Sequence, residues 1–199
     1  PAGGYTLSFG EGRCLAAGTK QVTVDGDETV DVLPSARVDT YGYHCHQAVT
    51  PYVAGTSVLP LTGDDESLEI ALPFAMPFYG ATYTKAWVAT NGFLTFDRAA
   101  DNSINREVPN SSYPNAAVFA LWDDLVVDAA ASVRTATLGT APDRRFVVEW
   151  RNVGFYGESD RVSFSAELSE HGGVTVHYGD LTGGSSSRGA SASIGIENM

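Results

Sequence analysis

The sequence predicts an all-β protein in which two antiparallel sheets pack face to face as a β-sandwich, preceded by an N-terminal accessory hairpin. Most apolar clusters alternate with polar residues at a period of two, which is the pattern of a half-buried strand. Gly, Pro, Asn or Asp bounds nearly every cluster, as tight turns require. No window sustains the apolar spacing of a long amphipathic helix. About ten closely spaced strands therefore favour a two-sheet sandwich.

The N-terminal part of the chain carries a predicted hairpin of its own. Residues 20–25 and 28–33 both alternate valines with polar residues. The dipeptide Asp25-Gly26 between them tolerates the positive φ angles of a two-residue turn. We therefore expect one strand on each side of this dipeptide. An isolated hairpin is only marginally stable in water, so these strands need a tie to another part of the protein.

The other strands are predicted in one series along the remainder of the chain. Residues 85–90 and 93–96 flank Asn91-Gly92, the strongest short-range hairpin signal in the sequence. Further strands are expected at residues 67–72, 116–121, 132–138, 145–151, 161–168, 174–178 and 191–197. Residues 125–131 are expected to form a connection, and the Gly- and Ser-rich residues 182–188 are typical of a flexible surface loop.

Composition excludes several classes of protein. The 199 residues are 43% hydrophobic, which is enough to build a core and argues against wholesale disorder. Twelve Lys and Arg residues against 24 Asp and Glu residues give a formal net charge of −12. This charge disfavours nucleic acid and anionic lipid as partners, because both are negatively charged themselves. There is also no apolar run long enough to insert into a membrane.

The two cysteines indicate the compartment. Cys14 and Cys45 are too few for a thiolate metal cage, and one disulfide in an oxidising compartment is the economical interpretation. Closing a loop of this length stabilises a protein by roughly 3 to 4 kcal/mol in the chain-entropy model. The alternative is two independent buried thiols. The start Pro1-Ala2-Gly3-Gly4 is expected to lie inside a longer precursor, so we expect a secreted chain covalently linked to neighbouring domains.

Two resemblances to known families fit this pattern. Gly4-Tyr5-Thr6-Leu7 and residues 20–34 resemble the closing strands of a carboxypeptidase-regulatory-like (transthyretin-like) β-sandwich. If the resemblance holds, only the last half of such a module would be present. The resemblance implies a partial module at residues 1–41.

The second resemblance covers residues 42–199 and rests on several ordered motifs. These are Leu72-Pro-Phe-Ala-Met-Pro-Phe-Tyr-Gly80, Ala86-Trp-Val-Ala-Thr-Asn-Gly-Phe-Leu-Thr-Phe96, Leu121-Trp-Asp-Asp-Leu125, Phe146-Val-Val-Glu-Trp-Arg-Asn-Val153 and Gly173-Val-Thr-Val-His-Tyr178. They resemble the nidogen-like and plexin-domain-containing extracellular β-sandwich, similar to accessory regions of secreted actinobacterial proteases and hydrolases. The resemblance implies a non-catalytic binding or adhesion module and names no ligand.

A group of acidic residues could hold a metal. The candidate ligands are Asp97, Asp101, Asp123, Asp124 and Asp128. Ca²⁺ takes six to eight oxygen ligands, and these carboxylates would supply some of them if their loops converge. The alternative is that they accept backbone N–H bonds and hold turns. No cofactor is required by the sequence, and calcium is the cation to test.

Candidate binding residues are aromatic, and no catalytic residue is assigned. Tyr79, Trp122, Phe155 and Tyr156 are the rings considered for a ligand. Of these, Tyr79 before Gly80 and Phe155-Tyr156 between Gly154 and Gly157 are expected to be exposed. Such rings can stack on sugars. No G-x-S-x-G nucleophile elbow occurs.

Paired carboxylates keep one catalytic alternative open. Asp123, Asp124, Glu149 and Glu167 lie on or near predicted strands, and two facing carboxylates suffice for a glycosidase. However, Glu149 and Glu167 alternate with apolar neighbours, as outward-facing polar positions do. We therefore expect a binding or adhesion accessory module of a larger secreted protein that recognises a glycan or an extracellular protein surface. The alternatives are a glycan-acting hydrolase near Trp122 and a structural spacer.

Overall fold

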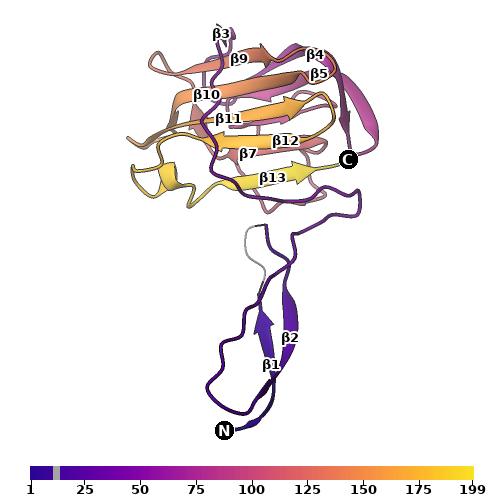
Figure 1. Ribbon diagram of the computed structural model, residues 1–199. Helices are drawn as coiled ribbons and strands as arrows, with labels where there is room; N and C mark the ends of the chain where they lie inside the picture. Colours follow the sequence, from indigo (N-terminus) through magenta and orange to yellow (C-terminus); the bar gives the residue numbers. More distant parts are fainter. Residues whose placement is uncertain (11–13) are drawn as a thin grey trace. The chain divides into compact units, whose positions relative to one another are not determined.

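The computed structural model describes residues 1–10 and 14–199 (Figure 1). Contacts between residues divide the chain into two compact units, Pro1–Thr50 and Pro51–Met199. The domain boundaries expected from the resemblances, 1–41 and 42–199, stay a prediction. Among the described residues, no helix is both long and apolar enough to cross a membrane.

The first unit contains a two-stranded antiparallel sheet. Strands β1 (Gly3–Phe9) and β2 (Gly18–Val24) pair over their whole length. The hairpin predicted around Asp25-Gly26 is wrong, because residues 28–33 form no strand and β2 pairs with the preceding strand instead. That pairing places Tyr5 opposite Val22, an aromatic and β-branched pair of the kind that stabilises sheets. Pairing β2 with the segment after it would instead gather the acidic residues that follow Val24.

A disulfide and a few backbone bonds hold the remainder of this unit. Cys14 and Cys45 form the disulfide predicted from the sequence. Beside it, the Arg37 amide donates to the carbonyl of Cys14, and the Cys45 amide donates to the carbonyl of Arg37, at 2.8 and 2.9 Å. The bridge thus ties the end of the unit to the hairpin, as an isolated pair of strands requires.

The second unit consists of two antiparallel sheets, as the all-β prediction requires. One sheet contains β3 (Ser57–Val58), β8 (Leu125–Val126), β9 (Ser132–Leu138), β10 (Arg145–Phe155), β11 (Arg161–Ser169) and β12 (Val174–Tyr178). The other contains β4 (Ser67–Phe78), β5 (Ala81–Ala89), β6 (Phe93–Thr95), β7 (Ala117–Trp122) and β13 (Ser193–Glu197).

Their strand orders are β12-β11-β10-β9-β3, with β8 pairing β10, and β13-β7-β6-β5-β4. The predicted Asn91-Gly92 turn joins β5 to β6, with Gly92 at a φ of 77°. A short 3-10 turn, η1 (Ser186–Arg188), lies in the predicted Gly/Ser loop.

Trp150 connects the two sheets in the core. Its ring is fully buried and stacks on Phe164 of the neighbouring strand, with 5.1 Å between ring centroids. Its indole Nε1–H donates to the carbonyl of Ala89 on β5 of the other sheet, at 2.8 Å. One side chain therefore buries a large apolar area and also fixes the position of one sheet against the other.

A second apolar cluster lies under the long connection between β6 and β7. Phe93 and Phe119 face each other across β6 and β7 and pack with Trp122, whose ring stacks on Phe119 at 4.8 Å. Val108 and Tyr113 of the connection pack against this cluster. Because Leu94 and Val118, which point to the opposite side of this sheet, are also fully buried, both of its sides are covered here.

Residues 51–58, which we call the strap, run across the sheet of β9, β10 and β11 before joining its edge as β3 (Figure 1). The hydroxyl of Ser165 on β11 donates to the carbonyl of Val53 at 2.7 Å. The Thr56 amide donates to the carbonyl of Thr135 on β9 at 2.9 Å. The strap therefore covers part of the outer face of the β9-β10-β11 sheet.

Reduction of the disulfide is expected to destabilise the first unit by about 3 to 4 kcal/mol, because it frees a long loop in the unfolded chain. All three tryptophans lie beyond residue 50, so their fluorescence reports on the second unit alone. In calorimetry, adding reductant should abolish the unfolding transition of the first unit or move it to a lower temperature. The unfolding midpoint reported by tryptophan fluorescence should stay unchanged. A fluorescence midpoint that falls on reduction would contradict this assignment.

Candidate functional site

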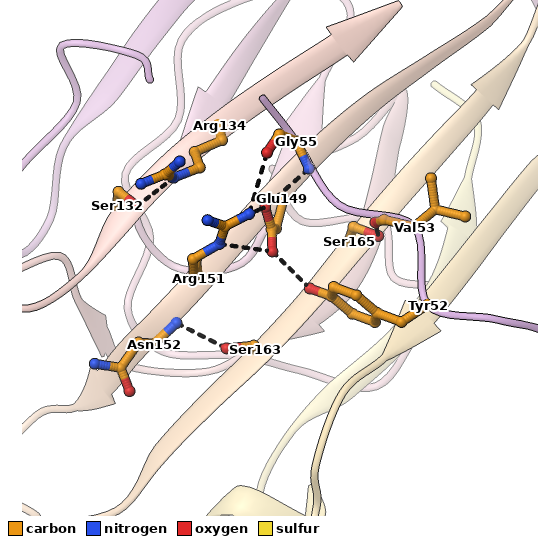
Figure 2. Close-up of polar contacts among 10 residues, drawn as sticks. All are labelled: Tyr52, Val53, Gly55, Ser132, Arg134, Glu149, Arg151, Asn152, Ser163 and Ser165. Atoms are coloured by element: carbon orange, nitrogen blue, oxygen red, sulfur yellow. Dashed lines mark hydrogen bonds and ion pairs between the residues drawn. The ribbon is translucent and has the colours of Figure 1, made fainter. Parts of the chain in front are cut away.

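The strap is held by a buried carboxylate. Glu149 on β10 is 1% exposed, although its side chain points to the outer face of the sheet. Figure 2 shows that its oxygens accept from the Tyr52 hydroxyl at 3.1 Å and from the Gly55 amide at 2.8 Å, both on the strap. They also accept two bonds from the Arg151 guanidinium, at 2.8 and 3.1 Å. The carboxylate is thus fully engaged by donors.

This network shifts the ionisation of its members. The hydrogen bond from Arg151 to Glu149 raises the pKa of the guanidinium above its ordinary value. Burial raises the pKa of Tyr52, and the adjacent Glu149 carboxylate raises it further, because a phenolate beside a carboxylate is unfavourable. Tyr52 therefore remains neutral, and its hydroxyl donates a hydrogen bond to Glu149.

The strap can lie this close because of one glycine. A Cβ atom on Gly55 would stand 2.7 Å from the Cβ and 2.8 Å from the carbonyl carbon of Arg134 on β9. Real side chains do not tolerate such contacts with a neighbouring backbone. Glycine at this position therefore lets the strap amide reach Glu149.

The second outward carboxylate predicted on this sheet is also paired. Glu167 on β11 accepts from the Arg145 guanidinium at 2.9 Å, and its Oε2 lies 3.7 Å from Nε2 of the buried His177. Both glutamates considered for a hydrolase thus lie on the outer face, as the alternation predicts. Their oxygens are bound to arginines on the same sheet.

Acidic side chains from two loops meet at the end of the sandwich. Asp64 and Asp65 follow β3, and Asp124 lies between β7 and β8. One carboxylate oxygen from each lies within 4.8 Å of the others. We call these three residues, together with Tyr156, the acidic rim. Three carboxylates at this separation supply the oxygen ligands that a hard cation such as Ca²⁺ prefers.

Asn91 at the β5–β6 turn brings the two loops together. Its amide Nδ2 donates to Oδ1 of Asp65 at 2.7 Å, and its Oδ1 accepts from the Leu125 amide at 2.8 Å. Gly63 and Val127 exchange two backbone bonds beside it, at 3.0 and 2.8 Å. A fully buried asparagine thus joins the segment before β4 to the turn after β7.

Burial and mutual repulsion both raise pKa values within the cluster. Burial, followed by the charges of Asp64, Asp65 and Asp123, raises the pKa of Asp124. Burial and the neighbouring Asp65 raise the pKa of Asp64. Oδ1 of Asp64 is itself buried and has no hydrogen-bond partner among the described residues. The folded chain therefore concentrates negative charge that bound cations or cationic groups would offset.

Of the five predicted metal ligands, the structure places Asp124 alone in this cluster. Asp123 accepts from the Asp124 amide at 2.9 Å and from the Ser191 hydroxyl at 2.5 Å. Asp101 contributes a backbone carbonyl near the cluster, which accepts from Asn91 at 3.3 Å.

Asp97 accepts from the Arg98 amide at 2.8 Å, and Asp128 accepts from the Ala130 amide at 3.0 Å and also pairs with Arg161. Turn-holding, the alternative interpretation, thus describes Asp97, Asp123 and Asp128. Asp64 and Asp65 were not predicted, because their proximity to Asp124 arises only from loops that are distant in sequence.

The four candidate rings differ in accessibility. Trp122 and Phe155 are buried, at 3% and 5% exposed, and the Trp122 indole donates to the carbonyl of Asn102 at 2.8 Å. Tyr79 is half-buried. Tyr156 is 62% exposed, and its amide donates to the carbonyl of Asp124 at 2.9 Å. The expectation that Tyr79, Phe155 and Tyr156 are exposed thus holds for Tyr156 alone, whose backbone adjoins the carboxylate cluster.

Comparison with known proteins assigns the family. A family model described as NIDO related matches residues 42–199. The chain belongs to this nidogen-related family. Neither the curated proteins nor the solved structures contain a match. Nidogen-related domains are generally non-enzymatic accessory modules of extracellular type, and the disulfide fits that setting.

The second unit, Pro51–Met199, lies wholly within the family match, and we call it the nidogen-related unit. Replacing Glu149 with alanine should destabilise this unit by about 2 to 3 kcal/mol, because Arg151, Tyr52 and the Gly55 amide all lose their acceptor. Glu69→Ala is the matched control, since it removes an ion pair with Lys85 in which both side chains are about half exposed. We expect its cost to stay below about 1 kcal/mol. Urea unfolding followed by tryptophan fluorescence measures both. Equal losses in the two variants would show that the strap network contributes no special stability.

Asp124→Asn should stabilise the nidogen-related unit at neutral pH in EDTA. The pKa of Asp124 is raised in the folded state, so ionisation of this group opposes folding above that pKa. The benefit of the amide should shrink as the pH falls below the raised pKa and should vanish below the ordinary pKa of an aspartate, where the carboxyl is protonated in both the folded and the unfolded chain. Thermal midpoints of the two proteins across this pH range measure the effect. Asp143→Asn, which alters an exposed carboxylate beside His171, is the control.

Proposed function

We propose that the chain is a non-catalytic binding or adhesion module of a larger secreted protein, and that it recognises a glycan or an extracellular protein surface through the acidic rim. The family assignment supports the accessory role. The exposure of Tyr156, whose backbone amide donates to the carbonyl of Asp124, supports this location, because an exposed ring suits a sugar or protein surface. This juxtaposition is the observation that carries the proposal.

Other segments of the chain partly cover both sheets, and this favours the acidic rim over the sheet faces as the binding surface. The strap lies on the outer face of the β9-β10-β11 sheet, where Glu149 and Glu167 are bound to arginines. The connection between β6 and β7 covers the other sheet around Trp122. The hydrolase alternative would use carboxylates near Trp122, yet Asp123 there accepts two hydrogen bonds that hold its turn. A structural spacer, the other alternative, would leave the rim without any role in binding.

Calcium is a second candidate, favoured by one observation. Oxygens of Asp64, Asp65 and Asp124 lie within 4.8 Å of one another, and Asp64 has a buried oxygen without a partner. A calcium ion would use these oxygens together with carbonyl oxygens and water, and it would stabilise the folded state by mass action.

We further propose that residues 1–41 derive from a transthyretin-like module and that the parent protein is an exported protease or hydrolase of actinobacterial type.

Binding of the whole chain to arrays of glycans and extracellular proteins, with calcium or with EDTA, tests the proposal. Tyr156→Ala should abolish or strongly weaken any binding found, because it removes the exposed ring of the rim. Tyr5→Ala removes an exposed ring from the first unit and should leave binding intact. Undiminished binding by the Tyr156 variant would place the recognition surface elsewhere. A melting temperature that is the same in calcium and in EDTA would remove the calcium candidate.

A further inference from the structure

One short stretch of the first unit has no structural role in the described chain. Residues 46–50, which we call the linker, are all exposed, and Val49 is fully exposed. They belong to no strand or helix. Within the described residues, no hydrogen bond, ion pair or apolar cluster involves them. Their backbone N–H and C=O groups are therefore open to another molecule.

Both ends of the linker are firmly held. Cys45 on its N-terminal side carries the disulfide to Cys14, and its amide donates to the Arg37 carbonyl at 2.9 Å. On its C-terminal side, Tyr52 and Gly55 of the strap donate to Glu149. The linker is therefore a short unpaired segment whose two ends are each held within their own unit, and extending it into the cleft of another protein costs little.

We propose that the linker is a proteolytic processing site, cleaved by an endopeptidase that accepts small or aliphatic side chains. Such enzymes bind their substrate as an extended strand through its backbone groups, and the linker offers these groups unpaired. The sequence His46-Gln-Ala-Val-Thr50 contains no Lys or Arg. Cleavage of the Thr50-Pro51 bond is disfavoured, because the proline nitrogen carries no hydrogen and its ring crowds the bond to be cleaved. The bonds on either side of Ala48 and Val49 are the expected targets.

The reaction is hydrolysis of one peptide bond by water. The C–N bond breaks, the carbonyl carbon gains a hydroxyl group to become a carboxylic acid, and the nitrogen becomes an amine. Because Cys14 and Cys45 both precede the linker, no covalent bond then joins the two products. The released fragment keeps Tyr52 and the strap, and with them the nidogen-related unit and its acidic rim. Cleavage would therefore free the binding module from whatever precedes it.

An exposed apolar residue elsewhere in the first unit provides an internal comparison. Leu33 is 94% exposed and lies in the irregular segment that follows β2. It lies inside the Cys14–Cys45 loop, so a cut there leaves its two products joined by the disulfide. Electrophoresis without reductant therefore distinguishes cleavage in the linker from cleavage near Leu33.

Limited digestion of the intact chain with elastase, followed by non-reducing electrophoresis and mass spectrometry, tests the proposal. The expected first product is a fragment that begins at residue 48, 49 or 50 and separates without reductant. The double variant Ala48→Pro, Val49→Pro should lose this product, because proline removes backbone donors and fixes φ. These side chains contact nothing described, so folding should be unaffected, and an unchanged tryptophan unfolding midpoint checks this.

Leu33→Pro is the matched control, and it should release the fragment at the wild-type rate. The proposal is overturned if the first products remain joined until reduction, or if the first cut falls beyond residue 51. It is equally overturned if the double proline variant releases the same fragment as fast as the wild-type chain.

Discussion

The burial of one carboxylate constrains much of this structure. Glu149 lies on the outer face of a sheet, where a charged side chain would ordinarily be solvated, yet it is almost inaccessible. A buried charge is tolerated only when it is paired and hydrogen-bonded. The Glu149 carboxylate can therefore be buried only because Arg151 and the strap donors are present. Gly55 makes the approach sterically possible. The segment that begins the nidogen-related unit is therefore part of its folded structure.

This constraint also bears on where the protein can recognise a partner. The strap lies on one sheet, and the long connection between β6 and β7 packs on the other with Val108 and Tyr113. The loops at the end of the sandwich, by contrast, carry three neighbouring carboxylates and the exposed Tyr156, whose backbone amide is bonded to the carbonyl of Asp124. This arrangement supports our proposal that the module binds through loop side chains carried by a rigid scaffold. The scaffold accounts for the long apolar strands, and the rim accounts for the acidic loops.

Local patterns predicted local structure well, and long-range contacts escaped prediction. The Asn91-Gly92 turn and most strands of the second unit could be predicted, because alternation and turn residues act over a few positions. The strand expected at residues 28–33 failed, since a better partner for β2 lay earlier in the chain. The outward direction of Glu149 was predictable, whereas its burial depends on a strap without any alternating pattern. Asp64 and Asp65 join Asp124 only because a buried asparagine links two distant loops.

Amide hydrogen exchange of the intact chain, measured by NMR, tests most directly whether the strap is an integral part of the folded unit. The Gly55 amide should be protected to nearly the same degree as the amides of β10, because its hydrogen bond to Glu149 opens only when the sheet face is exposed. The amides of residues 46–50 should exchange at the rate of an unfolded chain. Rapid exchange at Gly55, equal to that at Val49, would contradict this interpretation of the strap.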